Sequence, residues 1–298
     1  MDRITTLNDG RDESNIMQNL GTHNTNSTQH NDNINAYYDS PAVLLFEELA
    51  QQQIHLGYWD DKYPHVGFAQ AAKRLTQIVI DQIDIPKGAN FLDIGCGCGL
   101  PAIEIVKQKN CYLEGITINP QQQAKASTLA EVSGVSNRAS FCVGDASDLP
   151  YADHQFNGAL LLESIHHIGH QEALAEAWRV LKPGGTVLIA DGVVLKDEVA
   201  DTNKSMLAET FVAKSLLTES EIKAQLKQTG FTDIEVIDLT QAIQPTWSKL
   251  VEATSLNKTA IIKEYDIAFF EMLLDFWEQM SLVWSQNAKY LIIKANKV

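Results

Sequence analysis

The sequence has little positive charge. Lysine and arginine number 23 against 38 aspartates and glutamates, the formal net charge is -15, and the basic residues form no cluster along the chain. The phosphates of a nucleic acid and the anionic lipids of a membrane would both be repelled by such a protein. We therefore expect neither a nucleic acid nor an anionic membrane surface as a partner.

Long apolar runs and a secretory leader are also missing. No stretch reaches the roughly 20 apolar residues of a membrane-spanning helix, and the chain does not start with the basic and apolar segments of a signal peptide. Cysteine is scarce, and Cys96 and Cys98 lack a second pair at zinc spacing. These absences predict a cytoplasmic protein with reduced thiols, no integral membrane segment and no metal.

The beginning of the chain has few apolar residues and much Asn, Thr, Asp and Gln. Such a composition buries too little surface to offset the entropy lost on ordering, so residues 1–35 are predicted to be a disordered tail. Residues 36–85 carry apolar positions at helical spacing and an aromatic segment at 54–60, which predicts a helical cap.

A glycine-rich loop organises the rest of the chain. The apolar run 91–94 is typical of a buried strand, Gly95, Gly97 and Gly99 follow it, and Pro101 opens a helical pattern. Alternate glycines permit positive φ angles and let a ligand approach the backbone, next to the unpaired N–H groups of a helix start. A tight turn without a ligand is the alternative.

Strands and helices then alternate, which predicts an α/β fold with a doubly wound, mostly parallel sheet of seven strands. The expected strands are 91–94, 112–118, 139–143, 158–162, 186–190, 231–239 and 290–294. Helical patterns fill the long segment between the last two strands. We predict a core over 86–240, a helical substrate lid over 241–287 and a final core strand over 288–298, with helices that only pack on the core or on a second subunit as the alternative to a lid.

The pattern D-x-G-x-G-x-G at the glycine loop resembles the first motif of the class I S-adenosylmethionine (SAM)-dependent methyltransferases. The resemblance covers about four fifths of the chain and implies a Rossmann-like fold with SAM as cofactor. An acid would suit the amine of SAM, and backbone N–H groups would suit its carboxylate. The cofactor-binding residues that the motif implies are Asp93, Gly95, Cys96, Gly97 and Gly99.

The second strand lacks the acidic end residue with which most of this family binds the ribose hydroxyls. The segment instead resembles a variant, G-[IV]-T-x-[SN]-x-x-Q, found in relatives of the rebeccamycin-type sugar O-methyltransferases and in cyclopropane-fatty-acid and mycolic-acid synthases. The variant implies cofactor contacts from Thr117, Ile118 and Gln122, and an amide can both donate to and accept from a diol. The missing acid also argues against an NAD-dependent dehydrogenase.

Other loops and the cap supply further cofactor candidates. By the same resemblance, Asp145 accepts from the adenine amine beside Ala146, although an aspartate there could also cap the next helix. The aromatic segment of the cap resembles one that lies over the cofactor in sugar O-methyltransferases and tocopherol methyltransferases, or it only plugs the cap onto the core. We assign Tyr38 and His55 from the cap, and Glu163 past the fourth strand, to the cofactor site.

A histidine pair carries the clearest chemical signal. His166 and His167 follow the fourth strand and Asp191 follows the fifth, at the edge where open α/β sheets bind ligands. Histidine suits general-base work near neutral pH, and the pattern resembles the sugar O-methyltransferases, where these residues act on the acceptor hydroxyl. We predict all three as catalytic, with His166 favoured as base, Asp191 as base or orienting residue, and His167 open to a packing role.

The expected reaction is transfer of the SAM methyl group to a small-molecule acceptor, most simply a hydroxyl, in secondary metabolism. Three alternatives stay open: a cyclopropane-type lipid synthase, a C-methyltransferase acting on a quinol- or tocopherol-like ring, and a SAM-binding scaffold without turnover. An N-methyltransferase could do without a base, because an amine brings its own lone pair. The sequence leaves the acceptor and a homo-oligomeric state open.

Overall fold

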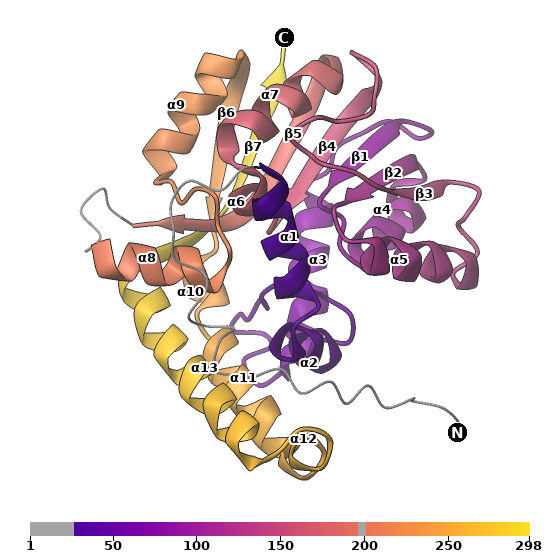
Figure 1. The fold of residues 1–298 in the computed structure, drawn as a ribbon. Helices are drawn as coiled ribbons and strands as arrows, with labels where there is room; N and C mark the ends of the chain where they lie inside the picture. The colour runs from indigo at the N-terminus through magenta and orange to yellow at the C-terminus, as the bar shows by residue number, and fades with distance from the viewer. Residues whose placement is uncertain (1–26, 196–200) are drawn as a thin grey trace.

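The computed structural model describes residues 27–195 and 201–298 (Figure 1). Its helices are α1 (Ser27–Tyr38), α2 (Pro41–Leu49), α3 (Phe68–Asp81), α4 (Leu100–Lys109), α5 (Pro120–Val132), α6 (Ile165–Ile168), α7 (His170–Val180), α8 (Asp201–Thr210), α9 (Glu219–Thr229), α10 (Thr240–Ile243), α11 (Thr246–Leu256), α12 (Lys258–Glu264) and α13 (Ile267–Asn287). Its strands are β1 (Asn90–Ile94), β2 (Tyr112–Thr117), β3 (Ala139–Val143), β4 (Phe156–Leu162), β5 (Leu181–Val194), β6 (Phe231–Asp238) and β7 (Ala288–Lys297). None of the described helices combines the length and the apolar character needed to cross a bilayer.

The described strands form one seven-stranded sheet in the order β3-β2-β1-β4-β5-β7-β6. The first five strands in that order pair in parallel, and β7 runs antiparallel to both β5 and β6. This arrangement confirms the predicted mostly parallel sheet. The chain crosses from β1 outward to β3 and then back to β4, so the β1 and β4 ends meet at the switch point where this class of sheet binds ligands.

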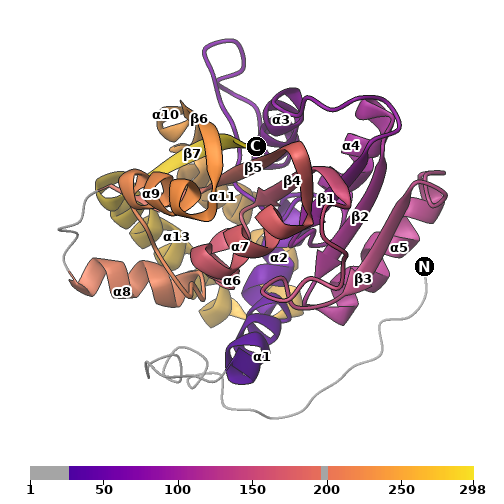
Figure 2. The same cartoon turned by 90° about the horizontal axis from the view of Figure 1, so that it is seen from above.

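Helices cover both faces of the sheet (Figure 2). Successive strand residues point to opposite faces, so Leu160 of β4 packs into the apolar cluster that includes α3 and α4, and Leu161 packs into the cluster that includes α7 and α9. Strands buried on both sides explain the continuous apolar runs in the sequence.

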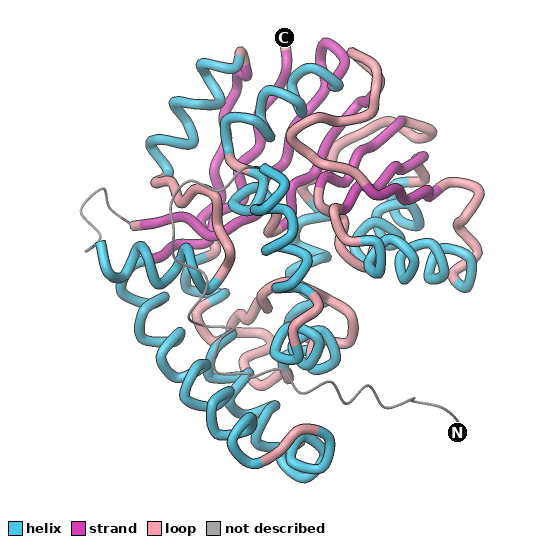
Figure 3. The backbone as a smooth tube through the Cα atoms, viewed as in Figure 1, coloured by secondary structure: helices cyan, strands magenta, loops and turns pink. Residues whose placement is uncertain are grey.

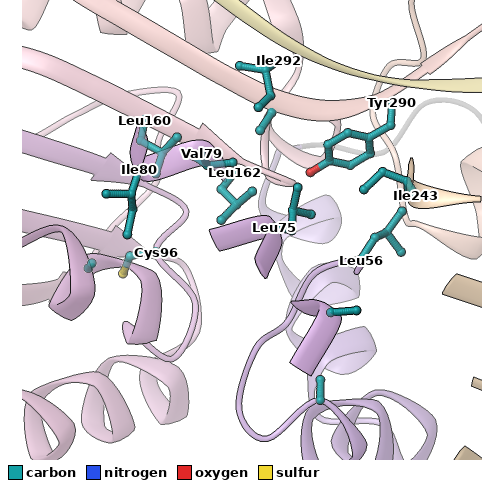
Figure 4. Packing of buried hydrophobic residues seen from close by; sticks show 14 of the residues in the cluster. Leu56, Leu75, Val79, Ile80, Cys96, Leu160, Leu162, Ile243, Tyr290 and Ile292 are labelled. Atoms are coloured by element: carbon teal, nitrogen blue, oxygen red, sulfur yellow. The ribbon is translucent and has the colours of Figure 1, made fainter. Parts of the chain in front are cut away.

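The helices inserted between β6 and β7 form an arm beside the sheet (Figure 3). Trp247 of α11 and Leu273 of α13 belong to the same apolar cluster as Leu75 of α3. The backbone N–H of Gly57 donates to the Thr246 hydroxyl at 3.3 Å. The arm and the cap therefore share one core, part of which Figure 4 shows.

Two sequence predictions are corrected here. Residues 27–35, assigned to the disordered tail, form most of α1, while residues 1–26 lie outside the described part of the chain. The helical pattern at the start of the predicted cap is also not continuous: Ser40 caps a new helix, α2, with Pro41 in its first turn. The tail prediction failed because one side of α1, with His30, Asn31, Asn33 and Ile34, faces a cavity of the core and not solvent, as described below.

A third correction concerns β5. The predicted strand 186–190 is part of a longer strand, because the antiparallel ladder with β7 extends as far as the pair Val194 and Ala288. The parallel ladder with β4 ends earlier, at the pair Leu162 and Ala190. Asp191 therefore lies within β5 rather than after it, one residue beyond the end of its β4 neighbour.

Candidate active site

The loop after β1 brings bare backbone to the wall of a cavity of about 660 Å³. A Cβ atom at Gly95, where φ is +81°, would lie 2.4 Å from the Cβ of Ser164, so this position requires glycine. At Gly97, where φ is +52°, the closest surrounding atom to such a Cβ would be Cδ1 of Ile54 at 3.8 Å. The N–H of Gly97 donates to no acceptor in the part of the chain that the structure describes. It is therefore available to a bound anion.

The loop after β2 supplies a second wall, which includes Thr117, Ile118 and Gln122. The Thr117 hydroxyl donates to the Gln122 side-chain oxygen over 2.7 Å, so the Gln122 amide N–H groups stay available to a ligand. Asn119 caps α5 by accepting from the backbone N–H of Gln122 at 3.0 Å, and its amide donates to Asp39 at 3.1 Å. The loop is thus fixed to α5 and to the junction of α1 and α2.

The loop after β3 adds Asp145 and Ala146 to the same cavity. One carboxylate oxygen of Asp145 accepts from the backbone N–H of Ser147 at 2.8 Å and from its hydroxyl at 2.7 Å. Its other oxygen accepts from the amide of Asn31 on α1 at 2.8 Å. Burial raises the pKa of Asp145, but the hydrogen bonds from Ser147 and Asn31 outweigh it and the net shift is downward. The carboxylate therefore stays ionised near neutral pH.

The chemistry of this cavity fits SAM. An N–H at the glycine loop suits the carboxylate, a primary amide after β2 suits the ribose diol, and an ionised carboxylate after β3 suits the adenine amine. The cavity also has the size of a small-molecule site, for which roughly 300–1,000 Å³ is usual. Tyr38, from α1, also lines this cavity.

Three predicted cofactor residues lie behind the cavity wall instead of lining it. Asp93 is only 2% exposed, and burial raises its pKa to about 7. Cys96 is part of the apolar cluster (Figure 4), where burial raises the pKa of its thiol. A Cβ at Gly99 would lie 2.7 Å from the Cβ of Ala126. Cys96 and Gly99 thus contribute to the packing of the glycine loop. Asp93 lies behind that loop, so it can act on a ligand only across the loop.

His55 does not belong to the cavity. Its Nδ1 donates to the Leu56 carbonyl at 2.9 Å, and its Nε2 lies 2.8 Å from the Gln53 side-chain oxygen and 2.9 Å from the Thr76 hydroxyl. Burial lowers its pKa to about 4. Because protein groups occupy both ring nitrogens, we correct its assignment from cofactor binding to a packing role in the cap.

His166 and Asp191 form a buried pair. Nδ1 of His166 lies 2.9 Å from both carboxylate oxygens of Asp191, so the proton on this nitrogen is the one that Asp191 accepts. Asp191 is held in turn by the Gly192 N–H, which donates to it at 2.7 Å. Nε2 of His166 is buried and has no hydrogen-bond partner among the described residues. The pair thus leaves a basic lone pair on Nε2 for a ligand.

The pair borders a second, smaller cavity of about 40 Å³. Its other walls are mostly apolar and come from separate segments: Leu56, Val193, Val194, Leu207, Phe211, Leu216, Trp284, Ala288 and Tyr290. The ring centroids of His166 and Phe211 are 6.1 Å apart. A polar pair in an apolar wall is suited to position one polar group of an otherwise apolar ligand.

His167 faces the other way and lines the larger cavity. Its Nδ1 donates to the Val212 carbonyl at 3.3 Å, which leaves Nε2 to accept from the Tyr38 hydroxyl at 2.9 Å. Burial and the neighbouring His166 hold its pKa well below the ordinary value. Both of its nitrogens are occupied, so the geometry offers no lone pair of His167 to an acceptor and favours the packing role.

Glu163 lines the small cavity, not the large one, so its expected place is corrected. One of its oxygens accepts from the Leu56 N–H at 3.0 Å and from the Tyr290 hydroxyl at 2.8 Å, and Figure 4 shows Tyr290 pointing into the cluster next to Leu56. Burial and the charge of Asp191 raise its pKa to about 8. Its backbone has φ +49°, a conformation that non-glycine residues seldom adopt. Glu163, just past β4, therefore links the cap to β7 by hydrogen bonds at the small cavity.

Sequence reasoning missed several residues of the two cavities, among them Asn31 and Phe211. Both come from elements outside the strand-end loops, and no motif marks either position. Trp284 belongs to the aromatic residues of the segment expected to form the lid, and it lines the small cavity.

Comparison with known proteins supports one family. A family model described as a methyltransferase domain matches residues 92–189. The chain is 33% identical over 210 residues to O-methyltransferase rstn1 of Aspergillus nomiae, covering 69% of this chain and 92% of the relative. It is 28% identical to (+)-O-methylkolavelool synthase of Herpetosiphon aurantiacus, covering 89% of this chain and 93% of the relative.

Solved structures share this fold. The [4+2]-cyclase SpnF is similar with a TM-score of 0.73 and 25% identity, over 90% of this chain and 96% of that one. Phosphoethanolamine N-methyltransferase 2 of Haemonchus contortus, solved with SAM bound, has a TM-score of 0.74 and 20% identity, over 89% of this chain and 60% of that one. The fold, the glycine loop and these relatives together show that the chain belongs to the class I SAM-dependent small-molecule methyltransferases, with SAM as its methyl donor.

Proposed function

We propose that the enzyme transfers the methyl group of SAM to a hydroxyl group of a largely apolar small molecule. The observation that carries this proposal is the buried, unpartnered Nε2 of His166, which is backed by Asp191. A hydroxyl is a poor nucleophile until its proton is being removed, so a placed base is the feature that distinguishes O-methylation from transfer to a free amine.

On the cofactor side, bound SAM supplies an electrophilic methyl group on a sulfonium. We assign its carboxylate to the backbone at Gly97, its ribose to Thr117, Ile118 and Gln122, and its adenine to Asp145 beside Ala146. We assign its amine to the loop above Asp93, whose carboxyl would ionise next to a cation. Asp93 has a pKa of about 7 without such a partner because of burial. Holding the donor in a fixed orientation contributes proximity.

On the acceptor side, His166 takes the hydroxyl proton on Nε2 while the oxygen forms its new bond to the methyl carbon and the carbon–sulfur bond breaks. The products are a methyl ether, S-adenosylhomocysteine (SAH) and one proton, which leaves through the imidazole. Asp191 fixes the tautomer that presents Nε2 as the acceptor and stabilises the imidazolium that results. A comparable arrangement supports proton transfer in serine hydrolases.

The apolar walls of the small cavity support an apolar acceptor. Phe211 and Trp284 flank the His166 and Asp191 pair, and no cation lines this cavity among the described residues. The name (+)-O-methylkolavelool synthase, carried by one relative, is that of an O-methylated product. A cavity of about 40 Å³ admits little more than the hydroxyl-bearing end, so we expect side chains such as Phe211 to move when the whole acceptor binds.

The test is incubation with methyl-labelled SAM and a panel of apolar terpenoid alcohols, phenols and amines of matched skeleton. We expect labelled methyl ethers from wild type, and a rate lowered about 10²–10⁴-fold in His166→Ala. If His166→Ala forms labelled amines or C-methylated rings at a normal rate, the O-methylation proposal is wrong. The enzyme would then transfer the methyl group without a protein base. SAM binding with neither SAH nor any labelled product would point to a SAM-binding scaffold without turnover.

A further inference from the structure

Helix α1 forms part of the cofactor cavity. His30, Asn31, Asn33, Ile34 and Tyr38 all line it, although residues 1–35 were expected to be a disordered tail and only Tyr38 was assigned to the cofactor site. The polar composition of α1 does not predict this role, because composition alone does not distinguish polar side chains that face a cavity from those that face solvent.

The position of α1 is set by several independent contacts. Nε2 of His30 donates to the carbonyl of His167 at 2.8 Å, the Tyr38 hydroxyl meets the same histidine from the other end of the helix, and Ile34 is only 5% exposed. The Asn31 side chain between these anchors is therefore placed by the docking of the whole helix.

Asn31 lies at the one oxygen of Asp145 that the loop leaves open. Ser147 donates twice to Oδ1 of Asp145, and Asn31 donates to Oδ2 at 2.8 Å. Because a carboxylate can only accept, the Asn31 group that meets it must be its NH₂, and its side-chain oxygen points elsewhere. That oxygen has no hydrogen bond among the residues the structure describes.

We propose that Asn31 completes the adenine subsite, so that its side-chain oxygen and the carboxylate of Asp145 together accept the two N–H groups of the exocyclic amine. This proposal rests on the assignment of adenine to Asp145 made above. Two linked acceptors match the two donors of an amine and disfavour a base that carries a carbonyl oxygen at the same place. Asparagine is also a common partner of adenine elsewhere, where it bonds the N6 and N7 edge.

The charge state of Asp145 agrees with this role. Its hydrogen bonds with Ser147 and Asn31 keep the carboxylate ionised in spite of burial. The NH₂ of Asn31 thus holds the acceptor in the charged form, and its oxygen adds a second acceptor beside it.

The experiment compares the dissociation constants of SAH and S-inosylhomocysteine, in which a carbonyl oxygen replaces the adenine amine. Isothermal calorimetry would be run on the full chain as wild type, Asn31→Ala, Asp145→Asn and Asn33→Ala. Asn33 is a matched control, since it has the same side chain, lies on the same helix and lines the same cavity. Melting temperatures confirm that each variant is folded.

We expect Asn31→Ala to weaken SAH binding about three- to tenfold, the value of a typical hydrogen bond, and to reduce the preference for SAH over S-inosylhomocysteine by a similar factor. Asn33→Ala should keep that preference. If Asp145→Asn abolishes the preference while Asn31→Ala leaves it intact, the role of Asn31 is refuted and the adenine assignment stands. If neither variant changes the preference, the adenine assignment itself is wrong.

Discussion

The two cavities at the edge of the sheet differ in their walls. One side of the larger cavity consists of backbone and short side chains from the loops that follow β1, β2 and β3, and its other side comes from α1, the segment after β4, and α8 with its following loop. The smaller one is walled by bulky apolar side chains from the cap, β5, α8 and its following loop, α13 and β7, around Glu163 and the His166 and Asp191 pair. The strand-end motifs thus supply one side of the donor cavity, whereas no such motif builds the apolar walls of the acceptor cavity.

The histidine pair marks the division between them. His166 and His167 have ring centroids 4.1 Å apart, yet His166 borders only the small cavity and His167 only the large one. Their hydrogen-bond partners thus give the two rings different roles: Nε2 of His166 is left for an acceptor, whereas both nitrogens of His167 are already hydrogen-bonded. Substitutions confined to one cavity should leave the other functional, and the following predictions test that separation.

The largest effect is expected at Gly97. In Gly97→Val the new side chain would enter the donor cavity at a position with φ +52°, so SAH binding should weaken by at least about 100-fold, which corresponds to roughly 3 kcal/mol. Gly88→Val is the matched control, because Gly88 has φ +77° with no atom near its Cβ position and lies away from the cavity. Calorimetry on both folded variants measures the effect. Normal SAH affinity in Gly97→Val would show that the glycine loop does not bind the donor.

The next effect concerns Asp191. We expect Asp191→Asn to lower kcat by about 10²–10⁴-fold with little change in SAH affinity, because an amide cannot stabilise the imidazolium of His166. The double variant with His166→Ala should be little slower than the slower single variant, since residues that act as a unit are not additive. Steady-state kinetics on all three variants measures this, and multiplied losses would show that the two residues act separately.

A smaller effect is expected for the apolar wall. Phe211→Ala removes a ring that packs within 6.1 Å of His166 and 6.0 Å of Trp284, measured between centroids. The acceptor KM should rise up to about tenfold, because an aromatic contact is worth about 0.5–1.5 kcal/mol. The dissociation constant of SAH should stay the same, since Phe211 does not line the larger cavity. Phe269→Ala serves as control, since Phe269 packs on Tyr265 at the far end of the arm. An equal rise in both variants would mean that Phe211 acts on the KM through overall stability and not as a wall of the acceptor cavity.

The smallest effect on catalysis is expected for His55, which borders neither cavity. Its folded pKa of about 4 lies below its ordinary value of 6.5 because it is buried, so between those values the unfolded chain binds more protons than the folded one. Stability contributed by neutral His55 is therefore present above pH 6.5 and is lost as the pH falls toward 4.

We expect His55→Gln to flatten that loss by up to about 1.4 kcal/mol per pH unit, the value for one proton. Urea unfolding at pH 7.5, 6 and 5 measures the slope, with wild type as the reference for all other groups. Turnover should stay near that of wild type. An unchanged slope would show that the imidazole already carries its proton in the folded protein.

The sequence predicted those parts of the site that depend on short segments. Gly97 and Asp145 each follow a strand and Thr117 ends one, and the sequence pattern predicts all three strands. Parallel topology then brings the ends of neighbouring strands together. Residues whose role depends on three-dimensional partners were less predictable. His55 was misassigned because only the fold reveals that Gln53 and Thr76 occupy its ring.

The acceptor cavity and α1 were beyond sequence reasoning for a related reason. Phe211 and Trp284 are separated by more than 70 residues, and their approach to His166 depends on how the arm packs against β7. In α1, polar residues at cavity positions gave the segment the composition of a disordered tail. Composition reports how much apolar surface a segment can bury, not what its polar groups contact.

The most direct test of the division between the cavities is a paired measurement on His166→Ala: the dissociation constant of SAH by calorimetry, and kcat as a function of pH with an acceptor from the labelled-methyl panel. The account predicts SAH affinity within about threefold of wild type, kcat lowered at least about 100-fold, and loss of the acidic limb of the pH–rate profile. A variant that keeps near-normal kcat with an unchanged profile, or one that loses SAH affinity and turnover together, would contradict it.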